Sequence, residues 1–306
     1  MPGTKVIVAV CTYHRNEPLT TLLESCLRNA DRLQGQASVG VVIVDDSKDQ
    51  TARPVAKRFE TSFELGLHYL SSASGNISTA RNMGLEGAAA RGDWIAMTDD
   101  DCEPEDRWLE SLLSVQARTG SDVVTGLMLR RPGAPAPAWL LEQGFLELGE
   151  FTAADGQVLT LAFTNNCLIS AHWVREQRDL RFDESLGRIG GEDMVFFGLA
   201  RAKGMCIRFS KQAIVYENEP AERLTFRYQL WRHYWHGNSS YITSVASGKS
   251  RPRMLVHGLA TAVRAAVRPF RRMIGRRSPQ VRYSMALLMQ AAGVVVGVLG
   301  RRVPHH

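Results

Sequence analysis

The sequence predicts an α/β protein with a mostly parallel central sheet, flanked by helices, and a basic helical C-terminal extension. Apolar strands alternate with helical segments as far as residue 102, which is typical of a parallel sheet covered by helices. Residues 41–44 (Val-Val-Ile-Val) are apolar on both faces, as expected of a buried parallel strand. Polar clusters follow several strands, where open α/β sheets bind ligands.

The first elements follow from hydrophobic periodicity. Residues 6–10 are predicted as a buried strand, because this apolar run is too short for a secretory signal. Leu19, Leu22, Leu23 and Leu27 form one apolar helical face. The other predicted elements of this half are strands at 39–44, 68–70 and 94–98 and helices at 51–59 and 79–90.

The pattern weakens after residue 102. A proline-rich loop is expected at 132–137, and Gly204 is a signal for the end of a helix. An apolar segment at 283–300 is bounded by arginines. The remaining predicted elements are a strand at 123–129 and helices at 108–116, 192–203, 225–236 and 251–277.

Composition narrows the class of protein. With 306 residues, 44% hydrophobic and 22% charged, the chain is long and apolar enough to bury a core, so it is not expected to be disordered. The five cysteines are odd in number and never spaced as Cys-x-x-Cys. This argues against a disulfide framework or a zinc site, and favours a reducing cytoplasm.

The net charge of +6 conceals an asymmetry. Glu222 is the last acidic residue, and 15 lysines and arginines follow it. The first 222 residues carry 22 basic against 31 acidic residues, a balance of −9. Such a basic tail indicates an anionic partner, either membrane lipid or nucleic acid, unless it is only a solvated helix. Apolar residues alternate with the arginines, which argues against a helix that is only solvated. We expect a membrane surface as the partner and no nucleic acid.

The strongest chemical signal is the triplet Asp99, Asp100 and Asp101 after a predicted strand. Adjacent carboxylates repel one another, so they need a compensating cation or solvent. Their oxygens suit Mg²⁺ or Mn²⁺, which could hold a diphosphate. The alternative is a solvated acidic turn that caps the following helix.

Six further positions allow a functional and a structural interpretation. Asp45 and Asp46 close a strand, where one of these carboxylates could accept a hydrogen bond from a ring N–H of a base, or both could belong to a turn. Arg81 could reach a phosphate or lie on the surface. Glu192 and Asp193 start a helix. One of them could be a general base, or both could simply interact favourably with the positive end of the helix dipole. Tyr13 could stack on a base or simply pack.

Taken in order, these motifs resemble family 2 glycosyltransferases of the GT-A fold. The resemblance covers roughly residues 5–240, and residues 75–108 look especially like bacterial exopolysaccharide enzymes of the succinoglycan glucosyltransferase type. The motifs are Val10-Cys11-Thr12-Tyr13, Val44-Asp45-Asp46-Ser47, Asn76-Ile77-Ser78-Thr79-Ala80-Arg81-Asn82, Thr98-Asp99-Asp100-Asp101, Asn165-Asn166 and Gly190-Gly191-Glu192-Asp193.

The resemblance implies a role for each matched position. Tyr13 matches the aromatic residue that stacks on the base, and Asp46 the acid that bonds uracil. Arg81 falls in the segment that faces the donor phosphates. Asp99 and Asp101 match the first and last acids of the DxD motif. The last acid there binds a divalent ion, Mg²⁺ or Mn²⁺, and the first lies near the ribose or the metal.

Catalysis is expected from the start of the 192–203 helix. Asp193 matches the catalytic base, with Glu192 beside it. Many relatives carry a histidine ligand after the last core strand, where this chain reads Val-Tyr-Glu-Asn, so Glu217 is the candidate substitute. We further place Thr12, Arg15 and Asp100 in the donor site, and Asn166 and Trp139 in the acceptor site.

These expectations give a three-part organisation. Residues 1–102 form the nucleotide-sugar-binding half, 103–240 the acceptor-binding and catalytic half, and 241–306 a membrane-associating region. The implied reaction moves a sugar from a nucleotide diphosphate donor, such as a UDP-sugar, to a hydroxyl of a glycan or lipid-linked saccharide in polysaccharide biosynthesis. It would take place at the cytoplasmic face of the inner or plasma membrane.

Two other functions use the same features. A nucleotidyltransferase would combine strand-end acids with a divalent ion, but it would carry a glycine-rich loop after the first strand. Residues 12–16 contain no glycine there. A non-catalytic nucleotide-sugar-binding protein would keep the fold and lose the chemistry, whereas an acid stands at each of the three expected sites.

Overall fold

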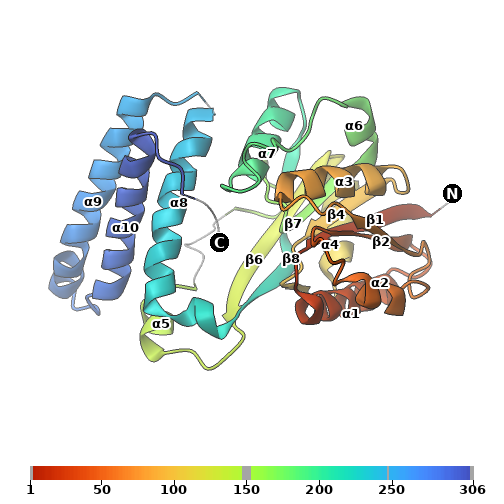
Figure 1. Ribbon diagram of the computed structural model, residues 1–306, viewed down its shortest axis with the longest axis horizontal. Coiled ribbons are helices and arrows are strands. Elements are labelled where there is room, and N and C mark those ends of the chain that lie inside the picture. Colours follow the sequence, from red (N-terminus) through yellow and green to blue (C-terminus); the bar gives the residue numbers. More distant parts are fainter. Residues whose placement is uncertain (1–2, 147–152, 247, 304–306) are drawn as a thin grey trace. The chain divides into compact units, whose positions relative to one another are not determined.

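The computed structural model describes residues 3–146, 153–246 and 248–303 (Figure 1). The chain divides into two compact units, which are described separately. The first comprises Met1–Leu129, Glu150–Gly187 and Glu192–Asn218. The second comprises Arg130–Gly149, Arg188–Gly191 and Glu219–His306.

The parallel half of the sheet belongs to the first unit. It contains β1 (Thr4–Thr12), β2 (Ala37–Asp45), β3 (Leu67–Ser71) and β4 (Trp94–Thr98) in the spatial order β3-β2-β1-β4. All three pairings between these strands are parallel. Because parallel strands point the same way, their carboxyl ends lie along one edge, as the sequence predicts.

The remaining strands make the sheet mixed. β7 (Asn166–Ser170) runs antiparallel to β4 and to β6 (Val123–Pro132). β5 (Cys102–Pro104) pairs antiparallel with β8 (Ile207–Glu219) and completes the order β3-β2-β1-β4-β7-β6-β8-β5. The sequence did not predict β5, β7 or β8.

Helices cover both faces of the sheet in the first unit (Figure 1). Successive residues of β1 point to opposite faces, so Val6, Val8 and Val10 join one core cluster and Ile7 and Ala9 the other. The first cluster is covered by α1 (Asn16–Arg32), α2 (Arg53–Arg58) and α4 (Trp108–Thr119), and the second by α3 (Ile77–Ala89), α6 (Ala171–Glu176) and α7 (Glu192–Ala202).

The second unit is helical. Its long helices are α8 (Phe226–Ala246), α9 (Arg251–Ile274) and α10 (Val281–Val298), preceded by the short α5 (Ala138–Glu142) and the 3₁₀ turn Ala221–Leu224. The expected boundaries at 102 and 240 do not coincide with the unit boundaries. Residue 102 begins β5, and residue 240 lies inside α8, which continues ten residues beyond its predicted end at 236.

Glycines allow α8 and α10 to pack backbone to backbone. A Cβ at Gly293 would stand 2.0 Å from the carbonyl oxygen of Tyr234, and one at Gly237 would stand 1.9 Å from that of Gln290. By length and composition alone, α10 could also cross a membrane. In the structure, the glycine contacts pack α10 against α8 within the second unit.

This packing predicts a difference between two helical glycines. Gly293→Ala should lower the free energy of unfolding by about 1–3 kcal/mol, because the methyl group meets backbone. Gly198→Ala in α7 is the matched control, since nothing lies within 4 Å of its Cβ position. The control should gain up to about 1 kcal/mol from helix propensity. Urea denaturation measures both, and equal stability would contradict the close α8–α10 contact.

Candidate active site

The candidate site lies at the carboxyl ends of β1, β2 and β4. Thr12 ends β1, Asp45 ends β2, and the three acids of the 99–101 triplet follow β4. β1 lies between the other two strands, so all three ends share one edge of the sheet. The sheet therefore gathers residues that are far apart in the sequence.

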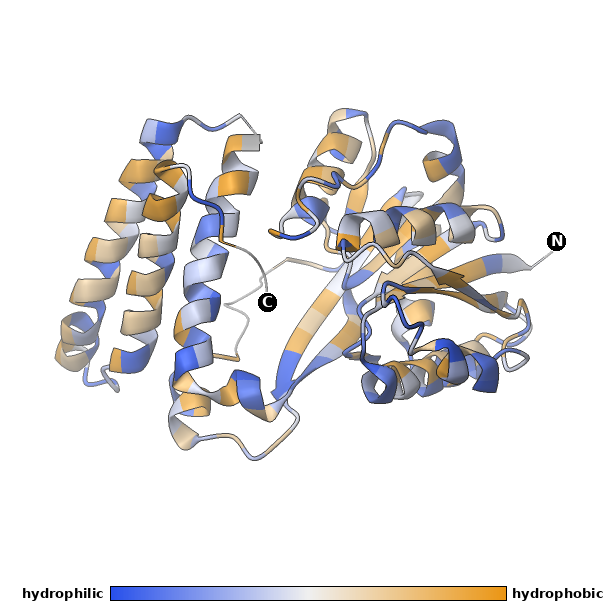
Figure 2. Cartoon of the chain, viewed as in Figure 1, coloured by the Kyte–Doolittle hydropathy of each residue, from blue (hydrophilic) through white to orange (hydrophobic). Residues whose placement is uncertain are grey.

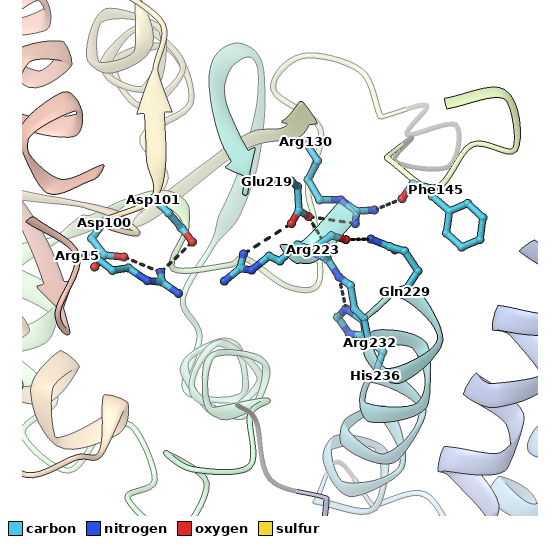
Figure 3. A network of polar contacts seen from close by, with 10 residues as sticks. All are labelled: Arg15, Asp100, Asp101, Arg130, Phe145, Glu219, Arg223, Gln229, Arg232 and His236. Carbon is cyan, nitrogen blue, oxygen red and sulfur yellow. Dashed lines mark hydrogen bonds and ion pairs between the residues drawn. The ribbon is translucent and has the colours of Figure 1, made fainter. Parts of the chain in front are cut away.

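Arg15 compensates part of the charge of the acid triplet. Its Nη1 donates to Asp100 Oδ1 at 2.9 Å and to Asp101 Oδ2 at 2.8 Å (Figure 3). Thr12 Oγ1 donates to the other oxygen of Asp100 at 2.9 Å. Burial raises the pKa of Asp100 to about 6, although Arg15 and Thr12 oppose that shift. Asp100 therefore anchors the loop that follows β1.

Arg81 joins the triplet to the start of α7. Its Nη2 donates to Asp99 Oδ1 at 3.1 Å, and its Nη1 donates to Glu192 Oε1. Its side chain is only 10% exposed. Burial opposes the charged form, but Glu192 and Asp99 outweigh it and raise the pKa of Arg81. A buried cation thus ties α3, the end of β4 and α7 together.

Asp193 lies in the first turn of α7, beside this ion pair. It is partly exposed, and the backbone N–H of Met194 donates to its Oδ1 at 2.8 Å. Burial, and then the charge of Glu192, raise the pKa of Asp193 to about 6, while Arg81 opposes the shift. A carboxyl group with this pKa is ionised at neutral pH and can still accept a proton effectively.

Asp46 organises the segment that leads into α3. Its Oδ1 accepts hydrogen bonds from Ser72, Ser74 and Gly75, and its Oδ2 accepts one from the backbone N–H of Asn76 at 2.8 Å. Asn76 in turn caps α3 by accepting from the backbone N–H groups of residues 78 and 79. One carboxylate therefore fixes the entry to the helix that carries Arg81.

Comparison with known proteins decides the family. The model of the Glycosyl transferase family 2 matches residues 7–178, more than half of the chain. The chain belongs to glycosyl transferase family 2. The matched range contains the carboxyl ends of β1, β2 and β4.

The glycosyltransferase is similar to named relatives. It is 30% identical over 266 residues to the succinoglycan biosynthesis protein ExoM of Rhizobium meliloti (strain 1021), covering 83% of this chain and 77% of ExoM. It matches the crystal structure of S. aureus TarS 1-349 with a TM-score of 0.56 and 16% identity, over 97% of this chain and 92% of that one. The same fragment in complex with UDP-GlcNAc gives a TM-score of 0.55 at 14% identity, with the same coverage. These structures confirm the predicted GT-A fold.

The fold implies a divalent metal, and the chain offers a fitting pair of carboxylates. The side chains of Asp99 and Asp101 are 39% and 16% exposed, although Arg81 and Arg15 contact them, whereas that of Asp100 is 7% exposed. Within residues 3–146, 153–246 and 248–303, no three His, Cys, Asp or Glu side chains form a metal-binding group. Mg²⁺ commonly binds one or two carboxylates together with substrate phosphates, so two oxygen ligands suit an ion that the donor completes.

Several predicted site residues take structural roles. Asn166, expected in the acceptor site, is buried, and its amide accepts from Trp108 Nε1 and donates to the carbonyl oxygens of Leu127 and Ala213, each at 2.8 Å. Arg81, expected to face phosphates, uses both Nη atoms on carboxylates of the protein. These contacts explain both side chains without a ligand.

Two predicted aromatic residues differ in setting. Tyr13 is 56% exposed in the loop after β1, where a base could stack on it. Trp139 belongs to the second unit, where its ring packs edge-on against Phe145 and Phe226 and lies under the guanidinium of Arg282. Both assignments remain predictions.

The buried carboxylate of Glu219, in the second unit, was not predicted from the sequence. It forms ion pairs with Arg130, Arg223 and Arg232, and Arg130 also donates to the carbonyl oxygen of Phe145 at 2.9 Å (Figure 3). Only the spacing of Glu219 and Arg223, four residues apart, is a local signal. Together these ion pairs hold the end of β8 to the end of β6, to the 3₁₀ turn and to α8.

The bridge made by Arg81 gives a test within the glycosyltransferase. Arg81→Met should lower the transfer rate at least roughly tenfold, because buried Glu192 loses its cation and repels Asp193. Arg81→Lys should restore part of the rate, since one ammonium cannot span both carboxylates as a guanidinium does. Steady-state kinetics measures both variants, and circular dichroism checks folding.

The exposed Arg178 supplies the matched control, because Arg178→Met removes the same charge from the surface. Its rate should equal that of the wild type. Equal rates for Arg81→Met and Arg178→Met would contradict a role for the bridge.

Proposed function

We propose that the chain is an inverting glycosyltransferase that moves a sugar from a UDP-sugar to a hydroxyl of a glycan or lipid-linked acceptor in polysaccharide biosynthesis. The observation that carries the proposal is the cluster in which Arg81 links Asp99, at the end of β4, to the turn that holds Asp193. The similarity to a succinoglycan biosynthesis protein supports the pathway class. The UDP-GlcNAc complex of the structural neighbour supports the donor class.

In the proposed reaction Asp193 acts as the general base. Its carboxylate accepts the proton of the acceptor hydroxyl as that oxygen attacks the anomeric carbon. The new C–O bond forms on the face opposite the diphosphate, whose C–O bond breaks, and the electron pair leaves with the diphosphate. This single displacement inverts the anomeric centre and needs no covalent sugar–enzyme intermediate.

The donor would bind along the strand ends. Tyr13 would stack on the uracil ring, and Asp46 would accept a hydrogen bond from the ring N–H. Arg15, whose side chain is 39% exposed, could exchange a carboxylate for a donor phosphate. Asp99 and Asp101 would hold Mg²⁺ or Mn²⁺, which when bound neutralises charge on the leaving diphosphate.

We place the enzyme at the cytoplasmic face of the inner or plasma membrane, held by its basic C-terminal region. The charge asymmetry supports an anionic membrane surface as partner. A lipid-linked acceptor is confined to that surface, so membrane residence would raise the frequency of encounter.

Product analysis separates this function from its two rivals. With a UDP-sugar, an acceptor and Mn²⁺, a glycosyltransferase releases UDP, a nucleotidyltransferase releases no nucleoside diphosphate by sugar transfer, and a binding protein releases nothing. NMR of the glycoside then reports the anomeric configuration. Retention of the donor configuration would contradict the single displacement.

The base assignment predicts the effect of removing one carboxylate. Asp193→Asn should keep UDP affinity and lower the rate of transfer by roughly 10²–10⁴-fold. Because the pKa of Asp193 is raised to about 6, the wild-type rate should fall as pH drops below about 6, where the protonated carboxyl cannot accept a proton. Glu192→Gln is the neighbouring control. An inactive Glu192→Gln together with an active Asp193→Asn would reverse the assignment.

The donor and metal assignments predict the outcome of a calorimetric titration. UDP should bind more tightly than GDP, and Mn²⁺ should strengthen UDP binding. Asp101→Ala should lose this dependence on Mn²⁺ and most of its transfer activity, and EDTA should inactivate the wild type. Tighter binding of GDP would overturn the uridine preference, and full wild-type activity in EDTA would overturn the metal requirement.

A further inference from the structure

α9 is apolar on two opposite faces. Its inner face contains the buried residues Met254, Gly258 and Ala265, and Gly258 packs against Val294 of α10. A helix that only closes a soluble bundle needs one apolar face and shows polar residues on the other. The second apolar face of α9 therefore needs its own explanation.

The outer face carries a continuous row of large apolar side chains. Their spacing of three, four and seven residues keeps them on one side of the helix, roughly opposite the inner face at about 100° per residue. Each is between 44% and 84% exposed, and Figure 2 shows the alternation of hydrophobic and hydrophilic residues along α9. The outer row consists of Val256, Leu259, Val263, Val267, Phe270 and Ile274.

Arginines run beside the outer row. Arg253, Arg264 and Arg271 are exposed, and their spacing of 11 and 7 residues places them along one edge of α9. No acidic residue follows Glu222 in the sequence, so this edge has no carboxylate of its own region to neutralise it. An apolar row with a basic edge matches the acyl boundary and the phosphates of an anionic bilayer.

The packing of α10 favours a helix that lies on the membrane over one that crosses it. Gly293 and Gly237 bring α10 and α8 into backbone contact, and Tyr241 of α8 fills the space beside Gly297. Moving α10 alone into a bilayer would break these contacts. The outer row of α9 is already exposed and requires no such rearrangement.

We propose that the outer face of α9 docks on an anionic lipid bilayer, with the helix axis in the plane of the interface. Val263, Phe270 and Ile274 enter the acyl boundary, and the arginine edge meets the lipid phosphates. Two antiparallel copies joined through this same face would bring their arginine edges together, which like-charge repulsion opposes.

This inference rests on the membrane residence proposed above and is independent of the sugar-transfer chemistry. The experiment is co-sedimentation of the full chain with vesicles of phosphatidylcholine and phosphatidylglycerol, and with vesicles of phosphatidylcholine alone. Val263→Ser combined with Phe270→Ser should weaken binding to the mixed vesicles by roughly tenfold or more. Arg264→Gln should weaken it by roughly fivefold, and only where phosphatidylglycerol is present.

A matched control replaces exposed apolar residues of the first unit. Val158 and Leu199 are 54% and 51% exposed, so Val158→Ser combined with Leu199→Ser removes comparable surface. It should bind like the wild type, and circular dichroism should show that all variants are folded. Size-exclusion chromatography with light scattering reports their oligomeric state.

The possible failures are distinguishable. If the wild type binds the mixed vesicles and the α9 double variant binds equally well, the docking face is wrong and membrane residence stands. If the wild type binds neither vesicle, both proposals fail. If the α9 double variant instead dissociates an oligomer, the outer row is a surface for a second copy and the lipid assignment is overturned.

Discussion

The candidate site depends on two arginines that hold a concentration of negative charge at one edge of the sheet. Three consecutive acids follow β4, and two more begin α7. Arg15 bridges two acids of the triplet, and Arg81 bridges the third to Glu192. Without these cations the carboxylates would repel one another or take up protons. The local fold and the ionisation of the site therefore depend on each other.

The two arginines differ in how easily they can exchange their carboxylate partners. The side chain of Arg81 is 10% exposed and that of Arg15 is 39% exposed. A buried guanidinium engaged with two carboxylates is costly to redirect, because each abandoned charge would stay desolvated. An exposed one exchanges partners at little cost. Arg81 thus suits a permanent role in positioning α7, whereas Arg15 suits a role that changes when a diphosphate arrives.

How much of the molecule could be predicted from its sequence depends on the range of the interactions involved. The parallel half follows from strands such as Ala37–Asp45, which are apolar on both faces, so local pattern and final burial agree. β7 and β8 escaped prediction because β7 is only five residues long and β8 carries polar residues such as Lys211 and Gln212 in its middle. Asn166 shows the same limit within the site. A motif marks Asn166 as a candidate site residue. Only the structure shows that its amide forms hydrogen bonds with one side chain and two backbone carbonyl groups.

Some features of the site residues also follow from the local sequence pattern, whereas others depend on contacts between residues that are distant in the sequence. Asp46 was predicted as a donor ligand, and its position at the end of β2 follows from the strand pattern. Its hydrogen bonds to Ser72, Ser74 and Asn76 depend on a loop whose course the pattern does not specify. The link between Arg81 and Glu192 spans 111 residues, and no spacing rule predicts it.

The second unit presents a constraint of a different kind, because its helices have more apolar surface than they can bury among themselves. α10 packs against α8 through glycine contacts and against the inner face of α9. The outer row of α9 therefore stays uncovered. Exposed apolar side chains scattered singly are ordinary in soluble proteins, but an unbroken row along a 24-residue helix marks an interaction surface. The arginine edge then restricts the kind of partner, since a purely apolar protein surface would leave those charges unmatched. A bilayer interface supplies an apolar layer and an anionic layer side by side, in the order that α9 presents them.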